Sequence, residues 1–514
     1  MVYHASMNNP EPETQKTADR TRRTPALLDL DAALTAFRAT VEPLLTGTAD
    51  RGWDGPQLLA RERALLQAGL VLVGQCIALL LFHLVSLPEV QQTARQRTQH
   101  LRQPGSMGHG KRTVNVMVSG GVVVPLRVEY IVARKPRQHP GRPRKRGQRD
   151  RAQNRGFYPV LKLLGIADHL SPLARSLVAE HGTRDLSFEA ARDTLAQMGI
   201  ALSLQRVARL THAFNQSGLR YRQSLLEQFQ QGTLPAGQPL AGHRVVIAVD
   251  GGRTRLRRAK RGRKRKGQRH HGYYPDWREP KLLTIYVLDE RGRKVSRGRG
   301  PLINDGTFES AETFLTLLEM HLFRLGLRQA EKVLLLADGS RWIWQRIPPL
   351  LRQWECPVEI ITEVLDFYHA TQQLYAFAQL AFASSPPAQR WYQKQRGRLK
   401  QGQVEAVLRS MQGLLAPAQG TAREALQTLY DYFATHRQRM AYKQLAEQHL
   451  PLGSGAVESL IRQVVNLRLK GAGKFWLQEH AEALLHARCW WAAGAWDQFR
   501  DLVLTIDLMP ALTN

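Results

Sequence analysis

The sequence predicts an α/β core that is interrupted by an all-helical segment and preceded by helical regions and a basic N-terminal part. Two observations carry this prediction. Short apolar runs separated by helical patterns are typical of the strands of an α/β sheet, and they occur at residues 245–249, 281–288, 333–337 and 358–364. Residues 370–450 then show no strand pattern and are rich in Gln, Ala, Leu and Arg, which predicts helices only.

The composition indicates a nucleic acid as the partner. Lys and Arg total 73 of the 514 residues against 43 Asp and Glu, a formal net charge of +30. So large an excess opposes compaction unless a polyanion balances it, and every phosphate that is neutralised releases counterions. A basic-tailed protein, such as a ribosome-associated one, is the alternative. With 43% apolar residues the chain can bury a sizeable interior, and its length predicts two or more packed units.

Cysteine usage and hydropathy favour a soluble, cytoplasmic protein without a membrane partner. The chain contains three cysteines, Cys76, Cys356 and Cys489. They share no short spacing, so neither a disulfide framework nor a cysteine-based zinc site is predicted. Residues 1–25 do not resemble a secretory signal. Residues 68–85 are long enough to span a membrane, but Gln75 and His83 interrupt them, and we interpret them as a buried or dimer-forming helix.

The N-terminal part is expected to begin as a mobile arm over residues 1–50, followed by a helical region over 51–110. Residues 111–156 are expected to hold a β-hairpin, with strands at 114–118 and 122–132, and then a linker rich in Arg, Pro and Gly. In this linker, Arg142 and Arg144 belong to the run Gly-Arg-Pro-Arg-Lys-Arg at 141–146, which contains the Gly-Arg-Pro core of an AT-hook and suits a narrow A·T minor groove. A nonspecific phosphate tether is the alternative.

Residues 157–235 are expected to be helical and to include a helix-turn-helix. Its two helices would be residues 188–198 and 203–214, joined by a short turn at Gly199. The second helix of such a motif enters the major groove, which makes Arg206 and Arg209 candidates for DNA contact. Two packed helices without this function are the alternative.

Two of the predicted strands end in an aspartate. Asp250 stands in Val-Asp-Gly-Gly-Arg and Asp338 in Ala-Asp-Gly-Ser-Arg. Strand ends are where α/β folds place ligand groups, and a carboxylate that follows a buried strand needs a cation or a hydrogen-bond partner. The glycine after each acid leaves room for a ligand or permits a turn. We therefore expect a metal site at this edge of the sheet.

A pair of divalent ions requires a third carboxylate, because hard cations take oxygen ligands. Glu458 is the candidate, since Gly453-Ser454-Gly455 predicts a helix start that places it in the first turn. Arg462, Asn466 and Lys470 follow at four-residue intervals and would meet the DNA backbone. A capping glutamate with a solvated basic face is the alternative. On spacing alone, the third acid would equally be Glu447 or Glu479.

Basic and aromatic residues near these acids predict further DNA contacts. The basic run after Asp250 is expected to be a hairpin tip that tracks DNA, although such runs are often only solvated. Its candidate residues are Arg253, Arg255, Arg263, Lys264, Arg265 and Lys266. Trp476, in a Gly-rich turn, is a candidate for stacking on an unpaired base. Arg468 and Lys474 in the same segment are further candidates for DNA contact.

The order of these motifs resembles that of RNase H-like DDE transposases with an all-α insertion, as in Mutator-like and hAT-like elements. Three segments look more closely like the bacterial ISKra group of insertion-sequence transposases: Val249-Asp250-Gly251, the run Ala-Asp-Gly-Ser-Arg-Trp-Ile-Trp at 337–344, and Gly-Ser-Gly-Ala-Val-Glu-Ser at 453–459. Residues 468–476 look like that group's closing segment, and Asp366-Phe367-Tyr368-His369 resembles its (C/D)-x-x-H motif. The resemblance is clear over residues 244–496 and departs upstream, where the group has a cysteine-containing segment.

The resemblance implies an RNase H-like core made of residues 243–369 and 453–505, with the insertion at 370–452. It also implies that Asp250, Asp338 and Glu458 bind two Mg²⁺ or Mn²⁺ ions. His369 would orient the scissile phosphate or support Asp366, with a structural His–Asp pair as the alternative.

The implied activity is cleavage of double-stranded DNA at the ends of the protein's own element and strand transfer into target DNA. The protein would act as a homodimer or larger assembly on terminal inverted repeats in the bacterial nucleoid. An RNase H-like nuclease or resolvase without strand transfer is one alternative. A transposase-derived DNA-binding regulator that has lost catalysis is the other.

Overall fold

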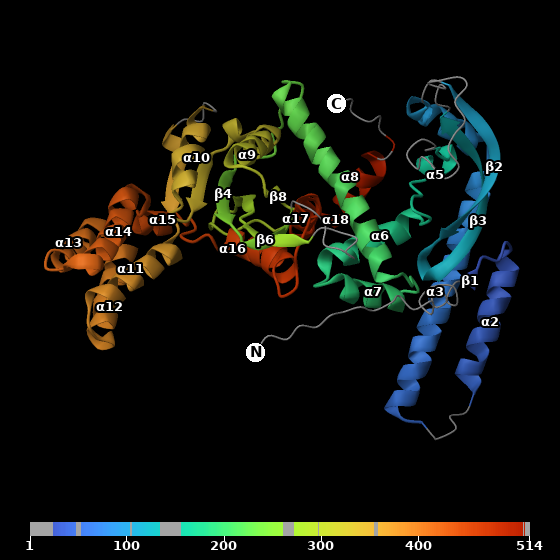
Figure 1. Cartoon of the computed structure of the whole chain (residues 1–514), viewed down its shortest axis with the longest axis horizontal. Coiled ribbons are helices and arrows are strands. Elements are labelled where there is room, and N and C mark those ends of the chain that lie inside the picture. The colour runs from blue at the N-terminus through green and yellow to red at the C-terminus, as the bar shows by residue number, and fades with distance from the viewer. Residues whose placement is uncertain are drawn as a thin grey trace. The chain divides into compact units, whose positions relative to one another are not determined.

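The computed structural model describes residues 24–47, 53–102, 105–133, 156–260, 272–296, 298–353, 358–506 and 508. The fold is mixed α/β with several sheets (Figure 1). The chain divides into two compact units, one made of Met1–Tyr221 with Asp497–Asn514 and the other of Arg222–Trp496. The linker that contains Arg142 and Arg144 lies outside the described residues.

The first unit contains the predicted β-hairpin. Strands β2 (Ser106–Met117) and β3 (Val122–Ala133) pair antiparallel, and the short strand β1 (Thr24–Pro25) runs parallel to β3. The turn requires glycine at Gly120, where φ is 76° and a Cβ would lie 2.0 Å from the carbonyl oxygen of Leu70. The hairpin turn therefore packs directly against the backbone of the helix that contains Leu70.

That helix, α3 (Gly55–Ser86), includes the long apolar stretch and lies beside α2 (Leu30–Thr46) (Figure 1). The expectation of an unstructured arm over residues 1–50 is wrong for α2. Asp29 caps this helix by accepting hydrogen bonds from the N–H groups of Asp31 and Ala32, and the helix packs against α3. Residues 1–23 lie outside the described part of the chain.

Within the described residues, α3 is the one helix that is long and apolar enough to cross a membrane, which by itself is weak evidence for a span. Gln75, a polar residue within the apolar stretch of α3, has hydrogen-bond partners inside the protein. The Gln75 amide donates to the carbonyl of Pro25 at 3.1 Å and accepts from the N–H of Leu27 at 2.7 Å. Gln75 thus ties α3 to the segment that carries β1.

The helices predicted over 157–235 are present. They follow α4 (Pro88–Arg97) and are α5 (Pro159–Leu163), α6 (Pro172–Arg184), α7 (Phe188–Gln197) and α8 (Leu204–Gln230). The pair α7–α8 matches the expected helix-turn-helix segments, but α8 is far longer than predicted. Arg206 donates to the carbonyl of Asp168 at 3.3 Å, and Arg209 forms an ion pair with the Asp168 carboxylate at 3.0 Å. Both arginines thus contact the loop before α6, and DNA reading by this pair stays a prediction.

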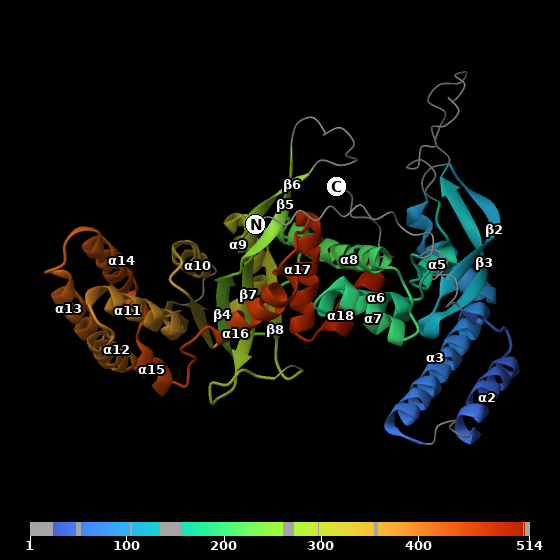
Figure 2. The same ribbon diagram turned by 60° about the horizontal axis from the view of Figure 1, so that its bottom comes forward.

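The second unit is built around a five-stranded mixed sheet with the order β10-β9-β4-β7-β8. Strands β4, β7 and β8 of this sheet are labelled in Figure 2. Its strands are β4 (Arg244–Gly251), β7 (Lys281–Leu288), β8 (Leu302–Thr307), β9 (Lys332–Ala337) and β10 (Ile361–Leu365). Strands β4, β9 and β10 are mutually parallel, and β7 is antiparallel to both β4 and β8. The sequence did not predict β8, because Asn304, Asp305 and Gly306 interrupt its apolar pattern.

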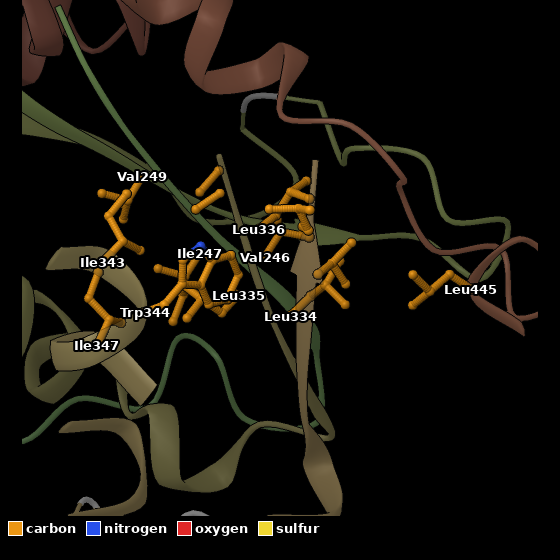
Figure 3. Packing of buried hydrophobic residues seen from close by; sticks show 14 of the residues in the cluster. Val246, Ile247, Val249, Leu334, Leu335, Leu336, Ile343, Trp344, Ile347 and Leu445 are labelled. Atoms are coloured by element: carbon orange, nitrogen blue, oxygen red, sulfur yellow. The ribbon is translucent and has the colours of Figure 1, made fainter. Parts of the chain in front are cut away.

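Helices α9 (Ala311–Leu325) and α10 (Arg341–Gln353) contact each other through Phe314 and Trp342, whose rings lie 5.5 Å apart. Figure 3 shows α10 against the sheet, with Ile343, Trp344 and Ile347 beside Ile247, Val249 and Leu335. These residues share one buried apolar cluster. The core therefore fixes the strands whose ends carry the predicted acids.

The segment after β10 is helical, as the sequence predicts. Its helices are α11 (Phe367–Ala381), α12 (Ser385–Lys400), α13 (Val404–Leu415), α14 (Gly420–His436) and α15 (Tyr442–Glu447), and they lie together beside the sheet in both views (Figures 1 and 2). The chain returns to the sheet with α16 (Gly455–Ile461), which packs on β4 and β7. It continues as a π-helical segment, η6 (Arg462–Leu469), and then as α17 (Gln478–Ala492), which packs on β8.

Candidate acidic site at the ends of three parallel strands

Three aspartates lie at one level of the sheet, at the ends of three adjacent parallel strands. Val249 of β4 is paired with Ala337 of β9, which is paired in turn with Leu365 of β10. The next residues in the chain are Asp250, Asp338 and Asp366. Since parallel strands end at the same sheet edge, the register alone brings these acids together.

Asp250 is only partly exposed, and its Oδ1 accepts a hydrogen bond from the N–H of Gly251 at 2.6 Å. Burial raises the pKa of Asp250 to about 6, in spite of this hydrogen bond. The charges of Asp338 and Glu458 raise it further, while that of His369 lowers it. Asp250 therefore lies close enough to Asp338 and Glu458 for their negative charges to affect its pKa.

Asp338 is held by the start of α10. Its Oδ1 accepts from the N–H of Ser340 at 2.9 Å and its Oδ2 from the Ser340 hydroxyl at 3.0 Å. The indole N–H of Trp344 donates to the main-chain carbonyl of Asp338 at 2.6 Å. The Ser and second Trp of the Ala-Asp-Gly-Ser-Arg-Trp-Ile-Trp motif therefore fix the acid and its backbone.

Helix α14 of the helical segment packs against the loop that follows Asp338. A Cβ at Gly339 would lie 2.1 Å from the ring of Tyr432 on α14, so only glycine permits this approach. Burial raises the pKa of Tyr432 and lowers that of His436 to about 4, so both side chains are neutral at pH 7. Two uncharged side chains of α14 therefore lie near Asp338. Their position depends on tertiary packing, and the sequence did not predict it.

Asp366 is fully buried, and it joins β10, α11 and the Gly-Ser-Gly segment. Its Oδ1 accepts from the N–H of His369 at 2.8 Å, and its Oδ2 accepts from the N–H of Ser454. Burial alone would raise the pKa of Asp366, but hydrogen bonds from His369 and Ser454 outweigh it and lower the pKa to about 2. The carboxylate of Asp366 thus has a structural role: it fixes the entry to α16.

His369 lies between Asp366 and Glu458. Its Nδ1 is 3.6 Å from Oδ1 of Asp366 and 3.9 Å from Oε1 of Glu458. The interaction with Asp366 raises the pKa of His369 to about 9 against the effect of burial, with Asp338 and Glu458 contributing. His369 is therefore an imidazolium at neutral pH and balances part of the negative charge.

Glu458 lies in the first turn of α16, as predicted, and accepts a hydrogen bond from the Ser454 hydroxyl at 3.3 Å. Among the described residues, Asp366, His369 and Glu458 form a group whose ligand atoms all lie within 4.8 Å and could hold a metal ion. This group shares only Glu458 with the predicted triad. The two other candidates for the third acid, Glu447 on α15 and Glu479 on α17, are not part of it.

Two of the predicted DNA contacts are wrong for this structure. Arg468 and Trp476 are buried, with 1% and 8% of their surfaces exposed. The Arg468 guanidinium lies 5.2 Å from the Trp476 ring, and the indole N–H of Trp476 donates to the carbonyl of Leu469 at 2.9 Å. The side chain of Trp476 thus packs on the end of η6, against Arg468 and Leu469. It is not open to a base, because its ring is buried although the Gly-rich turn before it is exposed.

The other predicted contacts differ in how far the structure describes them. Arg462, Asn466 and Lys470 are exposed, Lys474 is partly buried, and Arg253 is exposed while Arg255 is partly buried. Arg263, Lys264, Arg265 and Lys266 lie outside the described residues. For the exposed residues, DNA binding stays a prediction.

A second charged cluster, which the sequence did not predict, lies at the β8 edge. We call Arg222, Asp305, His321, Glu482 and His486 the buried ionic cluster; each is at most 8% exposed. Arg222 donates to Asp305 at 3.1 Å and to Glu482 at 2.5 Å. His321 and His486 contact Asp305 at 2.9 and 3.1 Å, and Glu482 accepts the N–H of Phe308. Only Glu482 and His486 lie close in the sequence, four residues apart on α17, so no spacing pattern reveals the cluster.

Comparison of the chain with protein-family models, curated proteins and solved structures found no match. The likeness to DDE transposases therefore rests on sequence motifs, and the activity that it implies is a proposal.

Proposed function

We propose that this protein is a metal-dependent DNA transposase of the DDE type with an RNase H-like core. The observation that carries the proposal is the convergence of Asp250, Asp338 and Glu458 beside the Asp366–His369 pair. The mixed sheet, with acids after its adjacent parallel strands and a helical segment before Glu458, supports the fold that the motifs imply.

The donor set fits divalent cations such as Mg²⁺ or Mn²⁺. Carboxylate oxygens are the ligands that these ions prefer. Burial first, and then the charges of Asp338 and Glu458, raise the pKa of Asp250, and a bound cation would offset both. Asp250, Asp338 and Glu458 would hold two ions. When bound, the ions activate a water or a DNA 3′-hydroxyl and stabilise the leaving 3′-oxygen.

The remaining residues position this set. Asp366 fixes the backbone at Ser454, four residues before Glu458, and so determines where the third acid stands. His369 keeps its proton at neutral pH and is suited to hold a phosphate oxygen of the DNA by a charge-assisted hydrogen bond. The hydroxyl and N–H of Ser340 orient the Asp338 carboxylate.

The test is a cleavage and joining assay with a duplex that carries the terminal repeats flanking the gene, a labelled target plasmid, and Mg²⁺ or Mn²⁺. We expect nicking at the repeat end and joining to the plasmid. Asp250→Ala, Asp338→Ala and Glu458→Ala should each lower cleavage by at least about 10³-fold while duplex binding persists. Glu447→Ala, which removes an exposed acid of α15, is the matched control and should retain activity.

Each alternative gives a different result. Cleavage without joined product would indicate a nuclease or resolvase, and duplex binding without cleavage would indicate a regulator. Full activity in Glu458→Ala would remove Glu458 from the site. Full activity in all three alanine variants would overturn the proposal.

A further inference from the structure

The hairpin that follows Asp250 has two unlike faces. Strands β5 (Thr254–Ala259) and β6 (Tyr273–Arg278) pair antiparallel, with Arg255 opposite Trp277 and Arg257 opposite Pro275. Side chains directly opposite each other share a face, and alternate residues of a strand do too. One face therefore carries Thr254 and Leu256, which are buried. The same face also carries Tyr274, Arg258, Asp276 and Arg278. The other face carries Arg255, Arg257, Tyr273 and Trp277.

We call this second face the hairpin platform; its residues are Arg253, Arg255, Arg257, Tyr273 and Trp277. Cations and rings alternate along it. The Arg253 and Arg255 guanidinium groups lie 5.0 and 5.5 Å from the Trp277 ring, and the Arg257 group lies 4.9 Å from the Tyr273 ring. The Phe475 ring lies between two members of the platform, 4.5 Å from the Arg255 guanidinium and 5.4 Å from the Tyr273 ring.

The rings of the platform are open to solvent. Trp277 is 48% and Tyr273 is 40% exposed, which is unusual for side chains that gain most from burial. The acid of β6, Asp276, lies on the opposite face and pairs with Arg278 at 3.0 Å. The platform thus offers positive charge and aromatic surface without a carboxylate among its members.

The platform has a fixed place relative to the acidic site. Gly252 alone separates Gly251, the last residue of β4, from Arg253. The hairpin is anchored through β5: the N–H of Arg257 donates to the carbonyl of Trp476 at 2.7 Å, and the Thr254 hydroxyl donates to the carbonyl of Leu469 at 3.0 Å. The backbone of Trp476 therefore pairs along the edge of β5, while Trp277 and Tyr273 on β6 remain exposed.

We propose that the hairpin platform binds an unpaired DNA strand by stacking bases on Trp277 and Tyr273 while Arg253 and Arg257 hold the phosphates. Sheets with exposed aromatic rings bind single strands in this way, because every base has a π-face and an unpaired base exposes it. In a duplex the bases already stack on one another, so the rings would add little there. The proposal goes beyond the proposed cleavage activity and does not depend on it.

The test measures binding of the full chain to fluorescein-labelled oligo(dT) and to a mixed-sequence duplex by anisotropy in EDTA, where metal-dependent cleavage cannot occur. Trp277→Leu should weaken oligo(dT) binding by about tenfold, since stacking contributes roughly 1–3 kcal/mol per base. Duplex binding should change less than about twofold. Tyr273→Leu should act in the same direction, and Trp277→Phe should retain most of the affinity.

Tyr274→Leu is the matched control, because Tyr274 is 56% exposed on the same strand but belongs to the opposite face. It should bind oligo(dT) like the unaltered protein. If Trp277→Leu does not fold, Tyr273→Leu and Trp277→Phe still report on the platform. Equal oligo(dT) affinity for the Trp277→Leu, Tyr273→Leu and Tyr274→Leu variants would overturn the proposal, whether or not the protein cleaves DNA.

Discussion

The acidic site and the buried ionic cluster lie in the same unit and use the same residue types, yet their charges are arranged in opposite ways. In the buried ionic cluster, Arg222 lies between Asp305 and Glu482, and the guanidinium contacts both carboxylates. In the acidic site, His369 is the one cation among the groups that act on Asp250, against Asp338 and Glu458. In the buried ionic cluster one guanidinium contacts both carboxylates, whereas in the acidic site two further carboxylates and a single imidazolium act on Asp250.

The two histidine environments show the same contrast. His369 is drawn into the charged form by Asp366, and its pKa is raised to about 9. His486 is fully buried, and burial lowers its pKa despite its contact with Asp305. The indole of Trp490 donates to Nε2 of His486 at 3.2 Å, so Nδ1 carries the proton toward Asp305. A neutral His486 suffices where a guanidinium already contacts both carboxylates, whereas His369 carries a positive charge among the acids of the acidic site.

The largest effect is expected from removing the guanidinium of the buried ionic cluster. Arg222→Met should lower the free energy of unfolding by about 3–5 kcal/mol, because it leaves Asp305 and Glu482 buried without their guanidinium. Urea unfolding followed by circular dichroism measures this. The exposed Arg341→Met serves as control and should change stability by less than about 0.5 kcal/mol. Equal stability of the two variants would contradict the role given to Arg222.

A divalent cation should supply the balance that the acidic site lacks. Mn²⁺ at 100 times its dissociation constant should stabilise the protein by about 2.7 kcal/mol, seen as a higher melting temperature. The Asp250→Asn/Asp338→Asn double variant should lose this shift, whereas Asp276→Asn on the hairpin should keep it. A shift of the same size in the double variant would place the ion elsewhere.

In the absence of metal ions, removing the negative charge of Asp250 should stabilise the protein. The folded pKa of Asp250, about 6, lies above its ordinary value, so its stabilising contribution is complete at low pH and lost as the pH rises through 6. Asp250→Asn in EDTA should therefore raise the free energy of unfolding by about 2 kcal/mol at pH 8. The difference should vanish below pH 4. A constant difference across this range would exclude titration of Asp250 as its cause.

The smallest effect is expected at His369. Its folded pKa of about 9 lies above the ordinary value, so its contribution is complete below about pH 6.5 and is lost as the pH rises through 9. His369→Gln should cost about 1 kcal/mol at pH 6 and much less at pH 10, measured by urea unfolding in EDTA. The exposed His449→Gln should show no such trend, and a loss that is equal at both pH values would contradict the charged role of His369.

The sequence predicted what local patterns determine. Asp250 and Asp338 follow apolar runs that became β4 and β9, and Glu458 follows a Gly-Ser-Gly start that became α16. Long-range packing determined the rest. Arg468 and Trp476 have the composition of a DNA contact but are covered when the hairpin pairs with their segment. The buried ionic cluster joins α8, β8, α9 and α17, a combination that no spacing rule specifies.

The close approach of Gly339 and Tyr432 has a consequence for engineering this chain. A methyl group at 339 would collide with the Tyr432 ring, so the loop after Asp338 and helix α14 fit as a matched pair, although nearly a hundred positions separate them. The helical segment is therefore not an independent module that can be exchanged at will. A chimera that imports a foreign segment at 370–452 needs the matching residue at 339 or a smaller side chain at 432. A Gly339→Ala/Tyr432→Ala pair offers a direct starting point for such exchanges.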